Sequence, residues 1–172
     1  MTNFAIRAAR PDEAGELGAL ALRSKAHWGY DQAFLDACRE ELAIPAEQVT
    51  RRRTLVAVSN AGVDGAVTDA SVAAGPAGAP GRILGFGTIE GEPPAGELGM
   101  LFVDPAVIGR GVGGALFARL AASATELGFH RLTIASDPNA EPFYLARGAV
   151  RIGAVPSGSV PGRVLPLLAF AL

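Results

Sequence analysis

The chain has 172 residues, a formal net charge of −2, and 49% hydrophobic against 19% charged residues. This length and apolar content predict one domain, residues 1–172, with its own core, and they exclude a wholly disordered chain. Apolar runs are too short for a membrane span, and no basic footprint favours nucleic acid. We therefore expect neither a membrane nor a nucleic acid as partner.

The N-terminal segment lacks the apolar core of a signal peptide. The single cysteine, Cys38, has no partner for an internal disulfide, which favours a reducing cytoplasm. The two histidines, His27 and His130, are far apart in the sequence, and no ligand spacing indicates a metal site. We therefore expect a cytoplasmic protein without a metal.

The first third of the chain predicts a strand followed by two helices. Residues Phe4 to Ala8 alternate in polarity, as in a strand, and a helix opens at Pro11 with acidic residues in its first turn. A second helix is expected from about Asp31 to Leu42. Between the helices, the segment from Ser24 to Asp31 breaks the pattern and holds the only tryptophan.

The remainder predicts strands that alternate with a long and a short helix. The strands are expected at Arg53–Ser59, Arg82–Ile89, Glu97–Val103, Arg131–Ser136, Val150–Val155, and from Val164 to the C-terminus. The long helix runs from Val112 to Leu127, and the short one begins near Ala140, with Asn139 as its N-cap, and ends at Gly148. Residues 60–81 are rich in Ala and Gly and predict a flexible loop between two strands.

A glycine-rich turn, Gly109-Arg110-Gly111-Val112-Gly113-Gly114, joins the strand that ends at Val103 to the long helix. Glycines at the start of a helix leave backbone N–H groups unobstructed at the positive end of the helix dipole. The turn therefore predicts a phosphate site.

Other interpretations of this turn are open from the pattern alone. Gly109, Gly111 and Gly114 fit the dinucleotide fingerprint, with Asp137 placed as a ribose-binding acid. However, residues 104–108 separate the glycines from their strand, and too little chain follows Asp137 for a doubly wound fold. A P-loop is excluded because Ala115 stands where Ser or Thr is needed. The glycines could also serve only close packing.

Two motifs resemble those of the GNAT N-acetyltransferase superfamily. Leu101-Phe102-Val103-Asp104-Pro105, followed by Gly109-Arg110-Gly111-Val112-Gly113, resembles its acyl-CoA motif. Asn139-Ala140-x-x-Phe143-Tyr144-x-x-x-Gly148-Ala149 resembles its second motif. The order of expected elements fits the family over essentially the whole chain. Two residues depart from the pattern: Ile108 stands where Gln or Arg is common, and Ala149 where an aromatic residue is usual.

This resemblance implies the α+β GNAT fold, a strongly twisted, mixed, mostly antiparallel sheet of six to seven strands with helices on both faces, in three layers. It also implies acetyl-CoA, or another acyl-CoA, as donor in the cleft between the fourth and fifth strands. The pantetheine arm would pair with the backbone of Leu101, Phe102 and Val103. The remaining donor contacts would come from Arg110, Gly111, Val112, Gly113, Gly114 and Asn139.

The resemblance also suggests roles in acyl transfer. Tyr144 stands where the family places a general acid, and a tyrosine hydroxyl is protonated at neutral pH; its alternative is a half-buried packing residue. Glu97 lies where one branch of the family has its general base, although an exposed acid at a strand end would look the same.

The acceptor site is expected at the break between the first two helices, with His27, Trp28 and Tyr30 as its wall, unless these side chains only fill the space between the helices. We expect direct transfer of an acetyl group in a ternary complex to a primary amine, either a small molecule or a peptide. A non-catalytic acyl-CoA sensor and a dinucleotide-binding oxidoreductase are the alternatives. The sequence leaves a homodimer open.

Overall fold

The computed structural model describes residues 3–60 and 81–172 of the chain. Its strands are β1 (Phe4–Ala8), β2 (Leu55–Ser59), β3 (Ile83–Glu92), β4 (Ala95–Val103), β5 (Arg131–Ala135), β6 (Val150–Pro156) and β7 (Val164–Ala171). Its helices are α1 (Ala14–Ala26), α2 (Gln32–Leu42), α3 (Ala46–Arg51), α4 (Val112–Glu126) and α5 (Glu141–Leu145), with short 3-10 turns at Pro11–Glu13 and Pro105–Val107. The loop expected over residues 60–81 lies outside the described residues except at its two ends.

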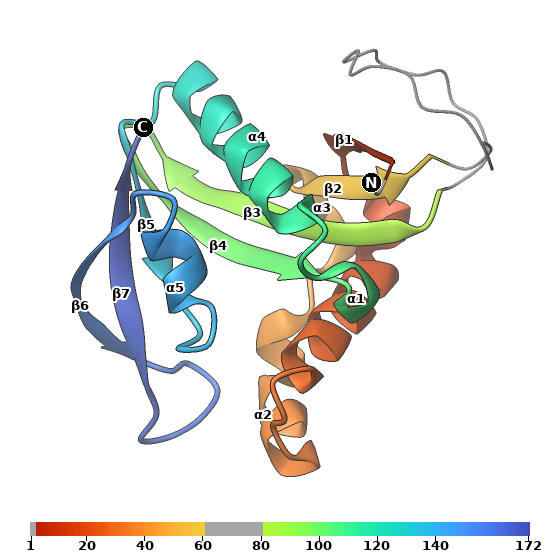
Figure 1. Cartoon of the computed structure of the whole chain (residues 1–172), viewed down its shortest axis with the longest axis vertical. Coiled ribbons are helices and arrows are strands. Elements are labelled where there is room, and N and C mark those ends of the chain that lie inside the picture. Colours follow the sequence, from red (N-terminus) through yellow and green to blue (C-terminus); the bar gives the residue numbers. More distant parts are fainter. Residues whose placement is uncertain (1–2, 61–80) are drawn as a thin grey trace.

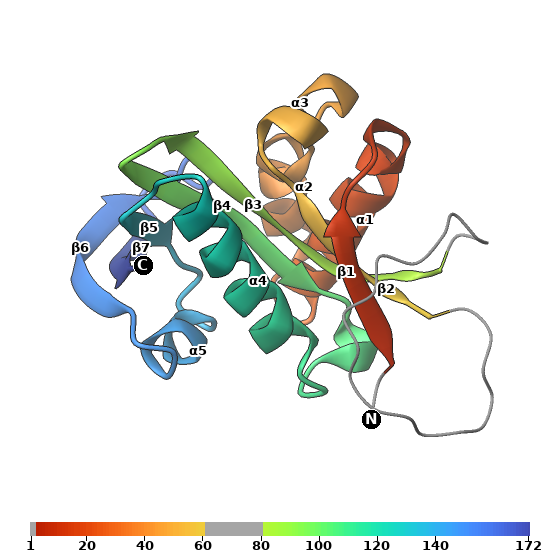
Figure 2. The ribbon, with the colours of Figure 1, turned by 90° about the horizontal axis from the view of Figure 1, so that it is seen from above.

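All seven strands form one sheet, in the order β1-β2-β3-β4-β5-β7-β6. Helices α1, α2 and α3 cover one face, whereas α4 and α5 cover the other (Figures 1 and 2). Five of the neighbouring pairs are antiparallel, and only β4 and β5 run parallel. The GNAT architecture expected from the sequence is therefore confirmed. A doubly wound parallel sheet, on which the dinucleotide alternative depends, is not what the chain forms.

The core lies on both faces of the sheet. On one face, buried side chains of α1 and α2 such as Leu17 and Cys38 pack on β2, β3 and β4. On the other face, Phe117 and Leu120 of α4 pack against β3, β4 and β5. Within the described residues, no helix has the length and apolar character needed to cross a membrane.

Two irregularities of β4 shape the centre of the sheet. The register with β3 shifts between Thr88 and Ile89, so that Gly99 is an extra residue on β4. A side chain at position 99 would collide with the Glu90 carboxylate, which explains the glycine there. In addition, β4 pairs with β5 over only three residues, Ala95 to Glu97. Beyond Glu97 the two strands diverge, and the sheet opens.

The structure differs from the expected elements in two places. A third helix, α3, follows Pro45; it shows no apolar periodicity because it has six residues and buries only Val49. Helix α5 begins at Glu141, and its N-cap is Ala140, without a side-chain cap bond. The prediction of Asn139 as N-cap was therefore wrong, because the Asn139 side chain is hydrogen-bonded to Tyr30 and Asp137 instead.

Candidate active site

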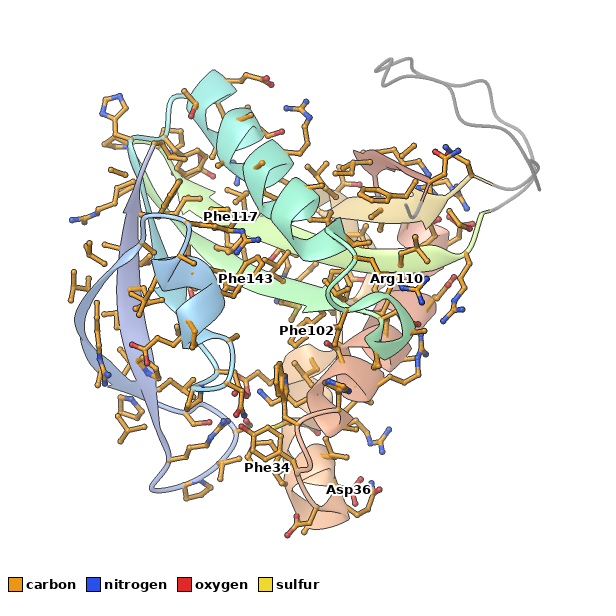
Figure 3. All side chains as sticks on the ribbon, in the orientation of Figure 1. Phe34, Asp36, Phe102, Arg110, Phe117 and Phe143 are labelled. Carbon is orange, nitrogen blue, oxygen red and sulfur yellow. The ribbon has the colours of Figure 1, made fainter. Side chains whose placement is uncertain are left out.

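A cavity of about 570 Å³ fills the space where β4 and β5 diverge. One half is lined by β4, the turn before α4, and α5, through residues such as Leu101, Gly113 and Phe143. The other half is lined by the ends of α1 and α2 through Lys25 and Leu42. Figure 3 shows two of the lining residues, Phe102 on β4 and Phe143 on α5. The cavity thus passes through the opened sheet from the α4 and α5 face to the α1 and α2 face.

The N-terminus of α4 faces this cavity with free backbone donors. Gly109 and Gly111 have φ values of +80° and +87°, a conformation that glycine adopts without strain and that turns the chain into the helix. Within the described residues, the N–H groups of positions 111–114 donate to no acceptor. Gly111, Gly113 and Gly114 line the cavity. Because free N–H groups and the helix dipole both favour anions, this turn can hold phosphate oxygens.

Arg147 adds a charged group to the same end of the cavity, and sequence analysis missed it. Its guanidinium stacks on the Phe143 ring at 3.6 Å and donates to the Phe143 carbonyl at 2.9 Å. A Cβ built at Gly114 would lie 2.9 Å from Arg147 Nη2, so the guanidinium lies beside the start of α4. It makes no ion pair with a described carboxylate. It is therefore free to bind an anion; the available signal was an arginine three residues after the motif tyrosine.

Of the other residues that were predicted to contact the donor, some line the cavity and some do not. Leu101, Phe102 and Val103 line the cavity, and the backbone of β4 has no β5 partner along them. The Val112 side chain is fully buried in the core, so that only its N–H group faces outward. Arg110 is exposed and lies on the side of its turn away from α5 (Figure 3), outside the lining of the cavity. Arg110 therefore does not line the cavity, whereas Arg147 does.

Tyr144 of α5 lines the cavity. The side chain is 6% exposed and packs against Phe117 and Phe143. Its hydroxyl has no hydrogen-bond partner among the described residues. Within them, Thr54 Oγ1 is the only side-chain oxygen or nitrogen that is both fully buried and without a partner. The Tyr144 hydroxyl is therefore not fully enclosed. Burial raises the pKa of Tyr144 above its ordinary value, and the nearby Arg147 charge opposes this only in part. The hydroxyl is therefore protonated and accessible from the cavity.

Glu97 lies beside the main cavity and not in its lining. It borders a second hollow of about 430 Å³, which Glu40, Glu41 and Glu90 also line. Burial and the neighbouring Glu90 charge raise the pKa of Glu97. The two hollows adjoin because Glu41, Gly99 and Met100 line both. An acceptor can therefore come close to Glu97 only if it enters through this second, acidic hollow.

A hydrogen-bond network ties the helical side of the cavity to the other side. The Tyr30 hydroxyl donates to both Asp137 oxygens, at 3.1 and 3.0 Å, and Arg163 donates to the Tyr30 oxygen at 2.7 Å. Tyr30 also stacks on Phe34 at 4.0 Å. Burial raises the pKa of Asp137, but the Asn139 N–H, the Lys25 charge and the Tyr30 and Arg163 bonds outweigh it, so that the net pKa is lowered. The network joins three segments that are far apart in the sequence.

Of the three residues predicted to form the acceptor wall, only Trp28 lines the cavity in the described part of the chain. Trp28 lines the cavity, and so does Asn139 from the opposite side. Tyr30 is held in the network, outside the lining, and His27 is exposed and packs edge-on against Trp28. Ser24 and Lys25 line the cavity, although sequence analysis did not single them out. Asp137 serves this network and is not free to bind a ribose, which removes a support of the dinucleotide alternative.

The fold and the cleft between β4 and β5 define a protein of the GNAT class. The acetyltransferase (GNAT) domain family matches residues 72–157, which is half of the chain. The chain belongs to this family. No curated protein matches the chain.

Solved structures of GNAT proteins resemble the chain over almost its whole length. A GCN5-related N-acetyltransferase from Rhodopseudomonas palustris has 23% identity and a TM-score of 0.73, and the match covers 100% of this chain and 98% of that one. PaiA N-acetyltransferase from Thermoplasma acidophilum, in complex with coenzyme A, has 14% identity and a TM-score of 0.72, with 99% of each chain covered. A putative acetyltransferase from Salmonella typhimurium, with its cofactor acetyl-CoA, has 20% identity and a TM-score of 0.62, with 98% and 94% covered.

Proposed function

We propose that the chain is an N-acetyltransferase that moves an acetyl group from acetyl-CoA to a primary amine by direct attack in a ternary complex. The observation that carries the proposal is the cavity through the opened sheet, which ends on the free N–H groups of α4. Two of the structural relatives were solved with coenzyme A or acetyl-CoA.

The donor end has the chemistry that a nucleotide-bearing thioester needs. The phosphates of acetyl-CoA would bind the N–H groups of positions 111–114 and the Arg147 guanidinium, since both favour negative charge. The pantetheine amides would pair with the β4 backbone along residues 101–103, where β5 has diverged. With the donor held in this way, the thioester would lie near Tyr144, which lines the same cavity.

The transfer step needs one group to give a proton and one to receive it. The amine nitrogen attacks the thioester carbonyl carbon, and the bond from this carbon to sulfur breaks. The Tyr144 hydroxyl, which its raised pKa keeps protonated until this step, gives its proton to the leaving thiolate. Glu97 is proposed as the base that takes a proton from the amine, directly or through water, because its raised pKa lies closer to neutrality than that of an ordinary glutamate.

The surroundings of Glu97 support an amine as acceptor. Four carboxylates, Glu40, Glu41, Glu90 and Glu97, border the second hollow, whereas Arg52 is the one cation among the described residues that line it. The Arg52 guanidinium pairs with Glu90 at 3.6 Å. A field of this sign attracts an ammonium group before it loses its proton.

The test has two steps. Calorimetric titration measures binding of acetyl-CoA and of NAD, and thiol release then measures turnover with a panel of primary amines. We expect binding of acetyl-CoA alone and turnover with at least one amine. Binding without turnover would favour the non-catalytic sensor, for which a protonated tyrosine in the cavity has no use. Absence of acetyl-CoA binding would overturn the proposal.

A further inference from the structure

Ser24 and Lys25, at the C-terminal end of α1, present unused polar atoms to the acceptor half of the cavity. We propose that these two side chains bind a carboxylate of the acceptor, so that the acceptor is an amino acid. This inference rests on the proposed acetyltransferase function and names its substrate class.

The Lys25 ammonium is held inside the protein by an ion pair with Asp137 and makes no hydrogen bond to another described side chain. The side chain is 13% exposed, and its nearest carboxylate oxygen, Asp137 Oδ2, is 3.5 Å from Nζ, without a hydrogen bond between them. The Asp137 oxygens are already occupied by donors from Tyr30, Arg163 and Asn139. The ion pair with Asp137 therefore holds Lys25 in place, and its ammonium, which has three N–H donors, can also meet a ligand carboxylate.

Ser24 is a buried polar side chain that is unpartnered within the described residues. It is 7% exposed and lines the cavity next to Lys25. A helical hydroxyl usually bonds the carbonyl one turn back, as Thr125 does with Ala121 at 3.1 Å in α4, but Ser24 makes no such bond. Its oxygen is not among the fully enclosed atoms without a partner, so it reaches the cavity. A hydroxyl that reaches the cavity without a protein partner is available to pair with a ligand.

The other charges at the cavity match a molecule that carries both signs. Glu41 lines the cavity close to the acidic hollow and forms no ion pair among the described residues. Arg147 lies at the donor end, and Arg163 is turned to Tyr30 and Asp137. An acceptor with an ammonium group toward Glu41 and a carboxylate toward Lys25 satisfies both ends. A diamine would instead place a positive charge against Lys25.

The experiment compares a series of amino acids with the corresponding amino-acid amides, which keep the amine and the side chain but lose the negative charge. Thiol release from acetyl-CoA gives kcat/KM for each, expressed per unprotonated amine because the amides have the lower amine pKa. We expect the best amino acid to exceed its own amide by about tenfold or more, the size of a hydrogen bond to a charged group.

Variants then assign the preference to this pair of residues. We expect the acid-to-amide ratio to fall toward one in Lys25→Met and to drop partly in Ser24→Ala, whereas Lys25→Arg keeps a ratio above that of Lys25→Met. Arg23→Met removes a cation of the same helix that pairs with Asp104, at 3.4 Å, outside the cavity lining, so it should keep the wild-type ratio. Thermal stabilisation by acetyl-CoA establishes that each variant is folded.

Three results would overturn the inference: amides used as well as amino acids, an unchanged ratio in Lys25→Met, or acetylation of simple amines only. In the last case the proposed function would stand. No acetylation of any amine, despite acetyl-CoA binding, would overturn the proposed function together with the inference.

Discussion

Removing the Tyr144 hydroxyl tests the chemistry separately from the fold. The Tyr144→Phe change deletes one oxygen and leaves the ring, which packs against Phe117 and Phe143. A placed general acid contributes roughly 10²–10⁴-fold to a rate, so we expect kcat to fall within that range. Because this oxygen has no partner among the described residues, its loss removes no protein hydrogen bond. We therefore expect the free energy of unfolding to change by less than about 1 kcal/mol.

The measurement has three parts. Stopped-flow or steady-state thiol release gives kcat, calorimetry gives the Kd for acetyl-CoA, and denaturant unfolding gives stability. Burial raises the pKa of Tyr144, and a raised pKa keeps the hydroxyl protonated. We therefore expect the wild-type rate to show no loss from this group between pH 6 and 9, a range that lies below the ordinary tyrosine pKa of about 10. Phe117→Leu, which changes the packing against Tyr144 but not the hydroxyl, is the matched control. A Tyr144→Phe variant with an unchanged Kd and full kcat would refute the assignment.

Four further predictions follow from the site. Arg147→Ala should weaken acetyl-CoA binding by about 10- to 100-fold in calorimetry, as expected for charged hydrogen bonds, while the exposed Arg119→Ala should not; equal effects would contradict a phosphate contact. Gly113→Val should weaken donor binding, since Gly113 lines the cavity beside the free N–H groups and its side chain would enter that space, and normal binding would reject the phosphate cradle. A general base must be deprotonated to act, and because the pKa of Glu97 is raised, the acidic limb of the kcat/KM profile should lie at a higher pH than for an ordinary glutamate. Glu97→Gln should lower the rate and remove this limb, and an unaltered profile would exclude Glu97 as the base. The pKa of Asp137 is lowered in the folded protein, so the stability that Asp137 contributes is present above its unfolded pKa and is lost as the pH falls through its folded pKa. Asp137→Asn should therefore flatten the fall in melting temperature at acid pH. An identical fall in both proteins would show that other carboxylates cause it.

The sequence alone determined the succession of strands and main helices along the chain and the glycine-rich turn at the start of α4. Local patterns suffice for these features: strands alternate or stay apolar, helices show a repeating apolar face, and glycines at a helix start leave N–H groups free. The positive φ values at Gly109 and Gly111 are properties of the backbone that a glycine signals directly. Tyr144 was found because it belongs to a motif with fixed spacing, and its role as an acid stays a prediction.

The tertiary structure decided the features that depend on contacts between distant segments. Arg110 and Arg147 are equally plausible in the sequence, but only Arg147 lies over Phe143 and beside the start of α4. Tyr30 was expected in the acceptor wall, yet Asp137, 107 residues away, holds its hydroxyl. The same network leaves Lys25 with an ion pair but no hydrogen bond to Asp137, because Tyr30, Arg163 and Asn139 donate to that carboxylate. Hydrogen-bond capacity of this kind depends on how each partner is satisfied, and no local pattern records it.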